Sequence, residues 1–284
     1  MRILIPGGNG QLGHDLQAVL GAAGDEVVAA GHAQLDITDR DAVMAAVTGV
    51  APDIVINCAA WTAVDACESD PSKAFAANGL AVRWLAEACD RVGAHLVQIS
   101  TDYVFDGALD RPYHEWDAPN PQSVYGSSKA AGEREALALG ARAAVVRTSW
   151  VCGVNGANMV KTIMRLAREH PQLSFVDDQI GHPTFTGDLA TALRRIAVDR
   201  RSGVHHLTNQ GETSWFGFAQ QVVAAMGLDP AMVAPIATSA LQPARPATRP
   251  ANSRLDNAVW RGAGLPAMRD YREPLGEVVR SLTA

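Results

Sequence analysis

The sequence predicts an α/β fold, a Rossmann-type doubly wound parallel sheet with a smaller α/β lobe interleaved with it. Apolar runs of strand length alternate with helically spaced apolar residues through the first half of the 284 residues. A glycine-rich turn lies between the first such run and the first helical pattern. Alternating strands and helices need crossover connections, which cover both faces of a parallel sheet with helices. A ligand site is therefore expected at the carboxyl ends of the strands.

The expected strands of the sheet are the apolar, β-rich runs of the first half. They lie at 2–6, 26–30, 53–57, 95–100 and 143–148. Apolar residues recur at helical spacing after the first strand and before the fourth, at Leu12, Leu16, Val19 and Leu20, and at Val82, Leu85, Ala86 and Cys89. Each strand is thus followed by a helix that can pack on the sheet.

After residue 150 this rhythm loosens, which predicts a second lobe. Its elements and those that rejoin the sheet are helices at 158–168, 188–198 and 215–226, strands at 173–176 and 204–207, and a closing helical tail. We expect a dinucleotide-binding domain at 1–150, with a return of the chain to it at 183–208. The substrate-binding lobe is then formed by 151–182 and 209–284.

Composition and charge exclude several classes of function. A net charge of −6, with both signs interspersed, leaves no basic stripe for nucleic acid. No apolar run approaches the roughly 18 residues that span a bilayer, and glycine ends the first apolar run too early for a signal peptide. The four cysteines form no CxxC and no Cys/His cluster, which predicts inert thiols. We expect a cytoplasmic protein with a small, anionic ligand and no membrane or nucleic-acid partner.

The glycine turn indicates dinucleotide binding. Gly7, Gly10 and Gly13 follow the first strand and open the first helix. Glycine is needed there so that the backbone can turn sharply, approach a pyrophosphate and pack helix on strand, while the helix N-terminus faces the anion. The alternative is a tight turn without a ligand.

The end of the second strand bears on the choice of cofactor. An acidic residue there would accept the ribose hydroxyls of NADH, but the strand runs into Gly31 and His32. Without a carboxylate, a ribose 2′-phosphate meets no like charge, so NADPH is at least as acceptable as NADH. Asp36 and Ile37 follow shortly and could reach adenine, although Asp36 could equally cap a helix that begins near Asp39.

Tyr125 and Lys129 are candidate catalytic residues because their spacing places both on one face of a helix that runs to about residue 139. With four tyrosines and three lysines in the chain, a chance Tyr-x-x-x-Lys has an expectation of only about 0.04. An ammonium beside a phenol lowers its pKa and makes it a usable acid or base. The alternative is an exposed pair on a helix surface.

Thr101 is a third catalytic candidate. It lies at the end of the fourth strand, where its hydroxyl could hydrogen-bond a substrate carbonyl. A strand-end Ser-Thr is equally an ordinary turn element.

With these features in order, the chain resembles the extended short-chain dehydrogenase/reductases. Five further segments make it similar to one family within them, the dTDP-4-dehydrorhamnose reductases. They are 57–65 (NCAAWTAVD), 100–107 (STDYVFDG), 147–151 (RTSWV), 178–184 (DQIGHPT) and 249–253 (RPANS). The resemblance covers residues 1 to about 280.

The resemblance implies the last step of dTDP-L-rhamnose synthesis, in which NADPH or NADH reduces the 4-keto group of dTDP-4-dehydro-L-rhamnose. Tyr125 would supply the proton and Lys129 would also hold the nicotinamide ribose. By the same resemblance, Gly10, Gln11 and Leu12 would contact the pyrophosphate, Asp36 and Ile37 adenine, and Ala59, Ala60 and Thr62 the length of the cofactor. The substrate residues would be Thr101, Asp102 and Trp150 at the sugar, with Arg249 and Asn252 near the nucleotide.

Some members of this family are magnesium-linked homodimers, and the matching positions are Asp15 and Asp188. Two separate acids on helices are otherwise surface charges, so Mg²⁺ and a homodimer stay open at this point and no metal ligand is assigned.

Two other functions stay open. One is another epimerase or reductase of nucleotide sugars on the same scaffold, although Tyr103 after Asp102 lacks the acid that a 4,6-dehydratase needs and the segment 249–253 disfavours an epimerase. The second is a non-catalytic regulatory subunit of methionine adenosyltransferase, which the joint presence of Thr101, Tyr125 and Lys129 disfavours. Trp84, Trp215 and Trp260 lie on helical runs, where packing is the expected role.

Overall fold

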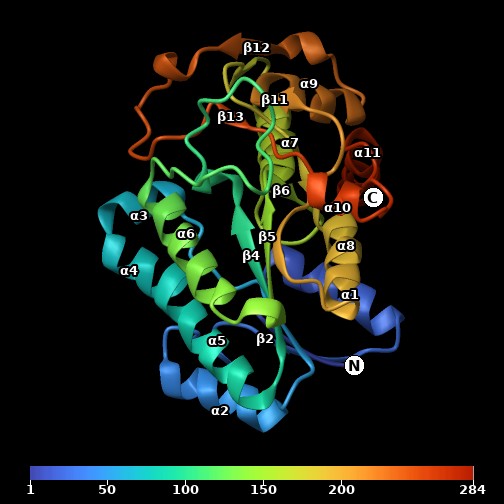
Figure 1. Cartoon of the computed structure of the whole chain (residues 1–284). Helices are drawn as coiled ribbons and strands as arrows, with labels where there is room; N and C mark the ends of the chain where they lie inside the picture. Colours follow the sequence, from blue (N-terminus) through green and yellow to red (C-terminus); the bar gives the residue numbers. More distant parts are fainter. Residues whose placement is uncertain (284) are drawn as a thin grey trace.

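A six-stranded parallel sheet forms the centre of the protein in the computed structural model, which describes residues 1–283 (Figure 1). Its strand order is β10-β5-β4-β3-β1-β2. The strands are β1 (Arg2–Pro6), β2 (Glu26–Ala30), β3 (Ile54–Asn57), β4 (His95–Thr101), β5 (Ala143–Thr148) and β10 (Gly203–His206). The doubly wound α/β prediction is confirmed.

The order in which the chain adds strands to the sheet reverses at β1, because β2 lies on one side of it and β3 on the other. Leu4 of β1 pairs with Val28 of β2 on one side and with Val55 of β3 on the other. The connections after β1 and β3 therefore leave in opposite directions and open a crevice beyond the carboxyl ends of these two strands. The glycine turn follows β1 at this point.

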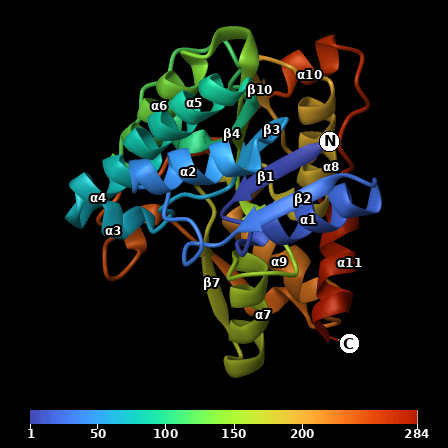
Figure 2. The same ribbon diagram turned by 90° about the horizontal axis from the view of Figure 1, so that it is seen from below.

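Helices cover both faces of the sheet, as the alternation of side chains along β1 requires. Ile3 and Ile5 belong to the core under one set of helices, and Leu4 to the core under the other. The first set is α1 (Gln11–Ala22), α8 (Thr186–Val198) and α10 (Ala258–Gly262), and the second is α2 (Arg40–Val50), α5 (Ala81–Val92) and α6 (Val124–Leu137). Figure 2 shows α2 and α5 on the opposite side of the sheet from α1 and α8.

Side-chain caps define where several of these helices begin. Asp39 caps α2 by accepting from the amides of Asp41 and Ala42. Asp36 instead accepts from Thr38, so the alternative that Asp36 caps this helix is wrong. Ser123 caps α6 through the amide of Gly126 and so sets the start of the helix that carries Tyr125 and Lys129.

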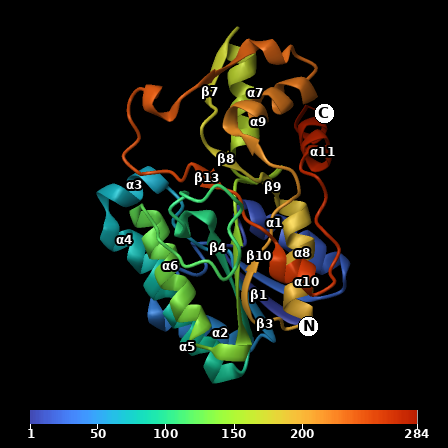
Figure 3. The ribbon, with the colours of Figure 1, turned by 45° about the horizontal axis from the view of Figure 1, so that its top comes forward.

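A smaller lobe stands over the carboxyl ends of the strands (Figure 3). Its helices are α7 (Met159–Glu169), α9 (Trp215–Ala225) and α11 (Arg272–Thr283), which share a core that includes Ile163, Phe218 and Leu275. Its short strands pair as β7 (Leu173–Val176) with β12 (Val233–Ile236), β8 (Ile180–Gly181) with β11 (Thr213–Ser214) and β13 (Asn252–Ser253), and β6 (Val151–Cys152) with β9 (Thr184–Phe185).

The remaining helical segments lie beside the sheet and in the connections. They are α3 (Val64–Ser69), α4 (Pro71–Phe75), a π-helical turn at Ala76–Leu80, and 3₁₀ turns at Asp102–Val104, Gly140–Arg142, Pro230–Met232 and Thr238–Ala240. None of the helices among residues 1–283 combines the length and apolar character that crossing a membrane requires.

The later half of the chain contributes to both parts. Strand β10 extends the sheet beside β5, and α8 covers its face, within the range 183–208. Trp260 of α10 also packs into the core of the sheet, although it lies in the range 209–284 that was expected to form the lobe. Local spacing cannot predict this contact, because α10 follows the lobe elements in the chain and meets the sheet only in the folded structure.

Candidate active site

Two adjoining cavities form one elongated cleft along the carboxyl edge of the sheet. The first, of about 640 Å³, lies over the ends of β1, β2 and β3, and the second, of about 560 Å³, lies between the sheet and the lobe. Gly10, Cys58, Ala59 and Ala60 line both. The structure brings most of the predicted site residues together here. Gly7, Asp36 and Ile37 line the first cavity, and Gln11, Leu12, Gly13, Thr62, Thr101, Asp102, Tyr125, Lys129 and Trp150 line the second.

The glycine turn packs against the neighbouring backbone at distances that only residues without side chains allow. Gly7 has a φ of +79°, and a Cβ on it would lie 2.5 Å from the amide nitrogen of Ala59. A Cβ on Gly13 would lie 2.5 Å from the carbonyl oxygens of Gly7 and Gly8. Helix α1 begins at Gln11, so its free amides face the same space. This cradle fits the pyrophosphate of a dinucleotide.

At the other end of the first cavity, Asp36 lies where an adenosine would extend. Its carboxylate accepts from the hydroxyl of Thr38 at 2.7 Å and from the Thr38 amide at 2.9 Å. These hydrogen bonds hold the pKa of Asp36 below its usual value. The carboxylate is thus charged, and it already accepts two hydrogen bonds from Thr38.

Burial sets the protonation of Tyr125. It raises the pKa of the phenol above its usual value, and the nearby charge of Asp102 raises it further. The prediction of a lowered pKa was wrong, because desolvation dominates and the charge of Asp102 acts in the same direction. Tyr125 is therefore a neutral phenol at physiological pH, which is the form that donates a proton.

Lys129 is held beneath the cleft. Its Nζ donates to the carbonyl oxygen of Ile99 at 2.6 Å, and its side chain is buried. Burial lowers the pKa of Lys129 to about 8, against the opposing effect of the Glu133 carboxylate. The lysine is mostly charged at neutral pH and its orientation is fixed by the end of β4.

Thr101 and Asp102 are linked at the end of the same strand. The Thr101 hydroxyl donates to Asp102 Oδ1 at 2.9 Å and accepts from the Tyr103 amide at 3.2 Å. Burial raises the pKa of Asp102 to about 6, although the hydroxyls of Ser253 and Thr101 lower it. A hydroxyl, a phenol and a carboxyl group of unusual basicity thus share one buried surface, which is typical of catalytic sites.

An asparagine that sequence reasoning missed anchors the helix beneath these groups. Asn78, in the π-helical turn, accepts from the Trp61 amide at 2.8 Å and donates to the Trp61 carbonyl and to the Ser128 hydroxyl at 3.0 Å. It therefore connects the floor of the cleft to α6. Helical spacing carries no signal for this role, because Trp61 and Ser128 meet Asn78 only in the folded chain.

Trp150 forms one wall of the second cavity. Its φ of +48° is rare for a bulky residue, and its ring stacks on that of Trp215 with centroids 3.7 Å apart. A Cβ on Gly181 would lie 2.6 Å from the Trp150 ring. Trp215, expected only to pack, also lines the cavity. A strained backbone held in this way is common at ligand sites.

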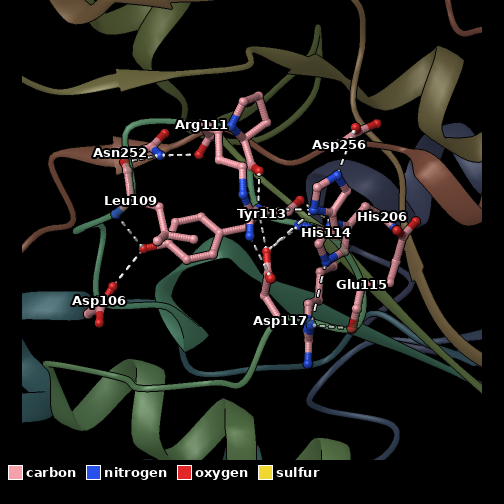
Figure 4. Close-up of polar contacts among 12 residues, drawn as sticks. Asp106, Leu109, Arg111, Tyr113, His114, Glu115, Asp117, His206, Asn252 and Asp256 are labelled. Carbon is pink, nitrogen blue, oxygen red and sulfur yellow. Dashed lines mark hydrogen bonds and ion pairs between the residues drawn. The ribbon is translucent and has the colours of Figure 1, made fainter.

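Arg249 and Asn252 do not line the cleft. Arg249 forms a bidentate ion pair with Asp65 of α3, at 2.8 and 3.0 Å. The Asn252 amide donates to the carbonyls of Leu109 and Arg111, both at 2.8 Å (Figure 4). Asn252 therefore ties β13 to the segment between β4 and α6, and in the structure this residue has a supporting role.

Asp15 and Asp188, the two acids for which magnesium was left open, do not fit a divalent cation in this structure. Asp188 forms an ion pair with Arg269 at 2.9 Å and accepts from the Asn209 amide at 2.6 Å. Asp15 accepts from the Asn155 amide at 3.3 Å. Within residues 1–283 no group of three or more His, Cys, Asp and Glu side chains could hold a metal. The guanidinium of Arg269 already supplies the positive charge beside Asp188.

The chain is similar to one family of known proteins over its whole length. The family described as "RmlD substrate binding domain" matches residues 1–284. The dTDP-4-dehydrorhamnose reductase of Streptomyces griseus is 45% identical over 282 residues, which are 97% of this chain and 92% of the relative.

Two solved structures are similar throughout. The dTDP-4-dehydrorhamnose reductase of Clostridium acetobutylicum has a TM-score of 0.96 and 40% identity, with 100% of each chain covered. The dTDP-4-dehydrorhamnose reductase of Bacillus anthracis, solved in complex with NADP, has a TM-score of 0.94 and 36% identity, with 99% of each chain covered.

Proposed function

The chain belongs to the RmlD substrate-binding-domain family, and from this premise we propose that it reduces the 4-keto group of dTDP-4-dehydro-L-rhamnose to dTDP-L-rhamnose with NADPH. It is an NAD(P)H-dependent oxidoreductase of dTDP-rhamnose biosynthesis. The observation that carries the proposal is the meeting of Thr101, Tyr125 and Lys129 in one cleft with the glycine cradle. The NADP in the Bacillus anthracis relative supports the choice of cofactor.

The reaction adds a hydride to C4 and a proton to O4 of the sugar, and NADPH supplies the hydride when it is bound. Tyr125 donates the proton, because its raised pKa keeps the phenol protonated until an alkoxide forms beside it. The Thr101 hydroxyl, which donates to Asp102 in the free protein, turns its hydrogen to O4 and polarises the carbonyl. Lys129, held at the end of β4 by the Ile99 carbonyl, would hold the nicotinamide ribose. Asp102 accepts from a sugar hydroxyl.

The remaining predicted residues take positions along the two ligands. The residues that would hold the cofactor line the two cavities, with Asp36 and Ile37 at adenine: Gly7, Gly10, Gln11, Leu12, Gly13, Ala59, Ala60 and Thr62. Residues 1–150 and 183–208 bind the cofactor, and 151–182 and 209–284 bind the nucleotide sugar. Trp150 contacts the sugar, and Arg249 reaches the nucleotide from the edge of the cleft. NADPH and nucleotide sugars are cytoplasmic, so we place the enzyme there. A magnesium-linked homodimer is not part of the proposal.

Loss of nicotinamide absorbance on adding dTDP-4-dehydrorhamnose to the protein and NADPH tests this function. We expect one NADPH to be oxidised for each sugar reduced, with the product identified as dTDP-L-rhamnose. A folded protein that binds NADPH and oxidises none of it contradicts the proposal. An epimerase, which regenerates its cofactor, or a regulatory subunit would then be the better interpretation.

Trp215 is expected to position the sugar through Trp150. Changing Trp215 to alanine removes the ring on which Trp150 stacks, an interaction worth about 0.5–1.5 kcal/mol in general. We expect the KM for the sugar to rise about tenfold, as 1.4 kcal/mol predicts, with NADPH binding unchanged. Initial rates at varied sugar concentration measure this. Trp116→Ala is the matched control, because that ring is 68% exposed and outside the cleft. A sugar KM within about twofold of the parent contradicts the role of Trp215.

A further inference from the structure

The rim of the first cavity carries an amide where a carboxylate would bind a ribose. Strand β2 ends at Ala30, and the next residue, Gly31, has no side chain. A Cβ on Gly31 would lie 2.3 Å from Nδ2 of Asn9 and 2.9 Å from Oε1 of Gln34. The carboxamide of Asn9 therefore occupies the space into which an acidic side chain at position 31 would extend.

The backbone on both sides of this space is fixed. The amides of Gly7 and Gly8 donate to the carbonyl of Ala30 at 2.9 and 3.0 Å, which ties the glycine turn to the end of β2. The amides of Gln34 and Leu35 both donate to the carbonyl of Gly31. Asn9 thus stands beside Gly31 for a structural reason, and it is exposed to the cavity that both residues line.

One carboxylate and one lysine line this cavity, so its rim has no excess of negative charge that would repel an anion. Asp36 is the acid among the residues that line the cavity, and Thr38 already donates two hydrogen bonds to its Oδ1. Lys73 lines the same cavity, with its Nζ 4.6 Å from the centre of the Trp61 ring. His32, which is also exposed, lies on the rim next to Gly31.

We propose that Asn9 is the residue that sets the preference for NADPH over NADH. Its carboxamide stands in place of the ribose-binding carboxylate and offers N–H donors to the 2′-phosphate, where an acid would repel that group. Lys73 adds positive charge to the same rim. This inference rests on the proposed function for the identity of the cofactor and names the residue that selects it.

Asn9→Asp is the direct test, because it changes the charge at this position and almost nothing of the shape. Equilibrium titration with NADPH and with NADH, each without sugar, measures the two dissociation constants. We expect the NADPH Kd to rise at least about tenfold and the NADH Kd to stay within about threefold, because only NADPH carries the 2′-phosphate that a carboxylate at position 9 would repel. A parent that binds NADH as tightly as NADPH, or a ratio that moves by less than about threefold, overturns the proposal.

Two further variants keep the test decisive. Asn9→Ala removes the donors without adding charge, so NADPH alone should weaken severalfold, even where the aspartate variant fails to fold. Gln221→Glu adds the same charge on the exposed face of α9 and should leave both constants unchanged. Since the titrations contain no sugar, a failure of the proposed reductase activity leaves their result intact, and the two failures are distinguishable.

Discussion

Replacing Tyr125 with phenylalanine is expected to lower kcat for ketone reduction by about a thousandfold, because general acid catalysis contributes roughly 10²–10⁴ in rate. The change removes the proton that O4 must receive. The ring itself packs edge-on against Tyr103, with centroids 5.4 Å apart, and beside Cys67 and Ala74. Phenylalanine keeps these contacts, so the fold and NADPH binding should be retained. Single-turnover rates and an NADPH titration measure the two effects separately.

Tyr271→Phe provides the matched control for this loss. It removes the same hydroxyl from a buried tyrosine in the core of the lobe, away from the cleft. Its kcat should equal that of the parent. A Tyr125→Phe variant that retains more than about a tenth of the parental kcat would mean that another group donates the proton, and the buried carboxyl of Asp102 would be the first to examine.

Replacing Glu133 with glutamine is expected to destabilise the protein by about 3–5 kcal/mol, the usual cost of removing one partner of a buried ion pair. Glu133 of α6 binds Arg147 of β5 through two hydrogen bonds, at 2.7 and 2.9 Å, and both side chains are buried. It also accepts from the Ser100 hydroxyl at 2.6 Å. Glutamine is similar in shape but leaves the Arg147 charge uncompensated. Denaturant unfolding of both proteins measures the difference.

The same variant should affect the site through Lys129. The Glu133 carboxylate raises the pKa of Lys129, which burial lowers to about 8. Without that charge the pKa of Lys129 falls further. As the pH rises, Lys129 in the variant therefore loses its proton earlier than in the parent. NADPH binding in Glu133→Gln should therefore begin to weaken at a lower pH than in the parent, as titrations across pH 6 to about 9 would detect.

Glu87→Gln is the control for the stability effect. Glu87 pairs with Arg40 at 3.2 Å on the surface, where an ion pair contributes about 0–1 kcal/mol. The control should therefore unfold almost like the parent. A cost below about 1 kcal/mol for Glu133→Gln would contradict the argument and would mean that Arg147 finds another partner, such as the carbonyl of Glu115.

The order of helices and strands was predictable because it depends on the spacing of residues that are close together in the sequence. The glycines at 7, 10 and 13, the apolar run of β1 and the four-residue step from Tyr125 to Lys129 each concern neighbouring residues. Hydrogen bonding and burial repeat with fixed periods in strands and helices, so such patterns predict an element and its buried face. The family resemblance extended this to Asp102 and Trp150, which line the cleft in the structure.

Other features depended on contacts between distant parts of the chain. Asn78 meets Ser128 across 50 residues, Asp188 meets Arg269 across 81, and Arg249 meets Asp65 across 184. No local period connects such pairs, so sequence reasoning missed Asn78, left magnesium open and did not foresee the ion pair of Arg249 with Asp65.

The protonation of the site depended on the fold for a related reason. The sequence placed Lys129 beside Tyr125 and predicted a lowered pKa, but burial of the phenol raises it. The energy of a charge is set by how much water surrounds it, and that is decided by every element that packs over it. By itself, the sequence determined the sheet, the cradle and the residues of the cleft. The tertiary structure alone decided which of those residues are free, paired or protonated.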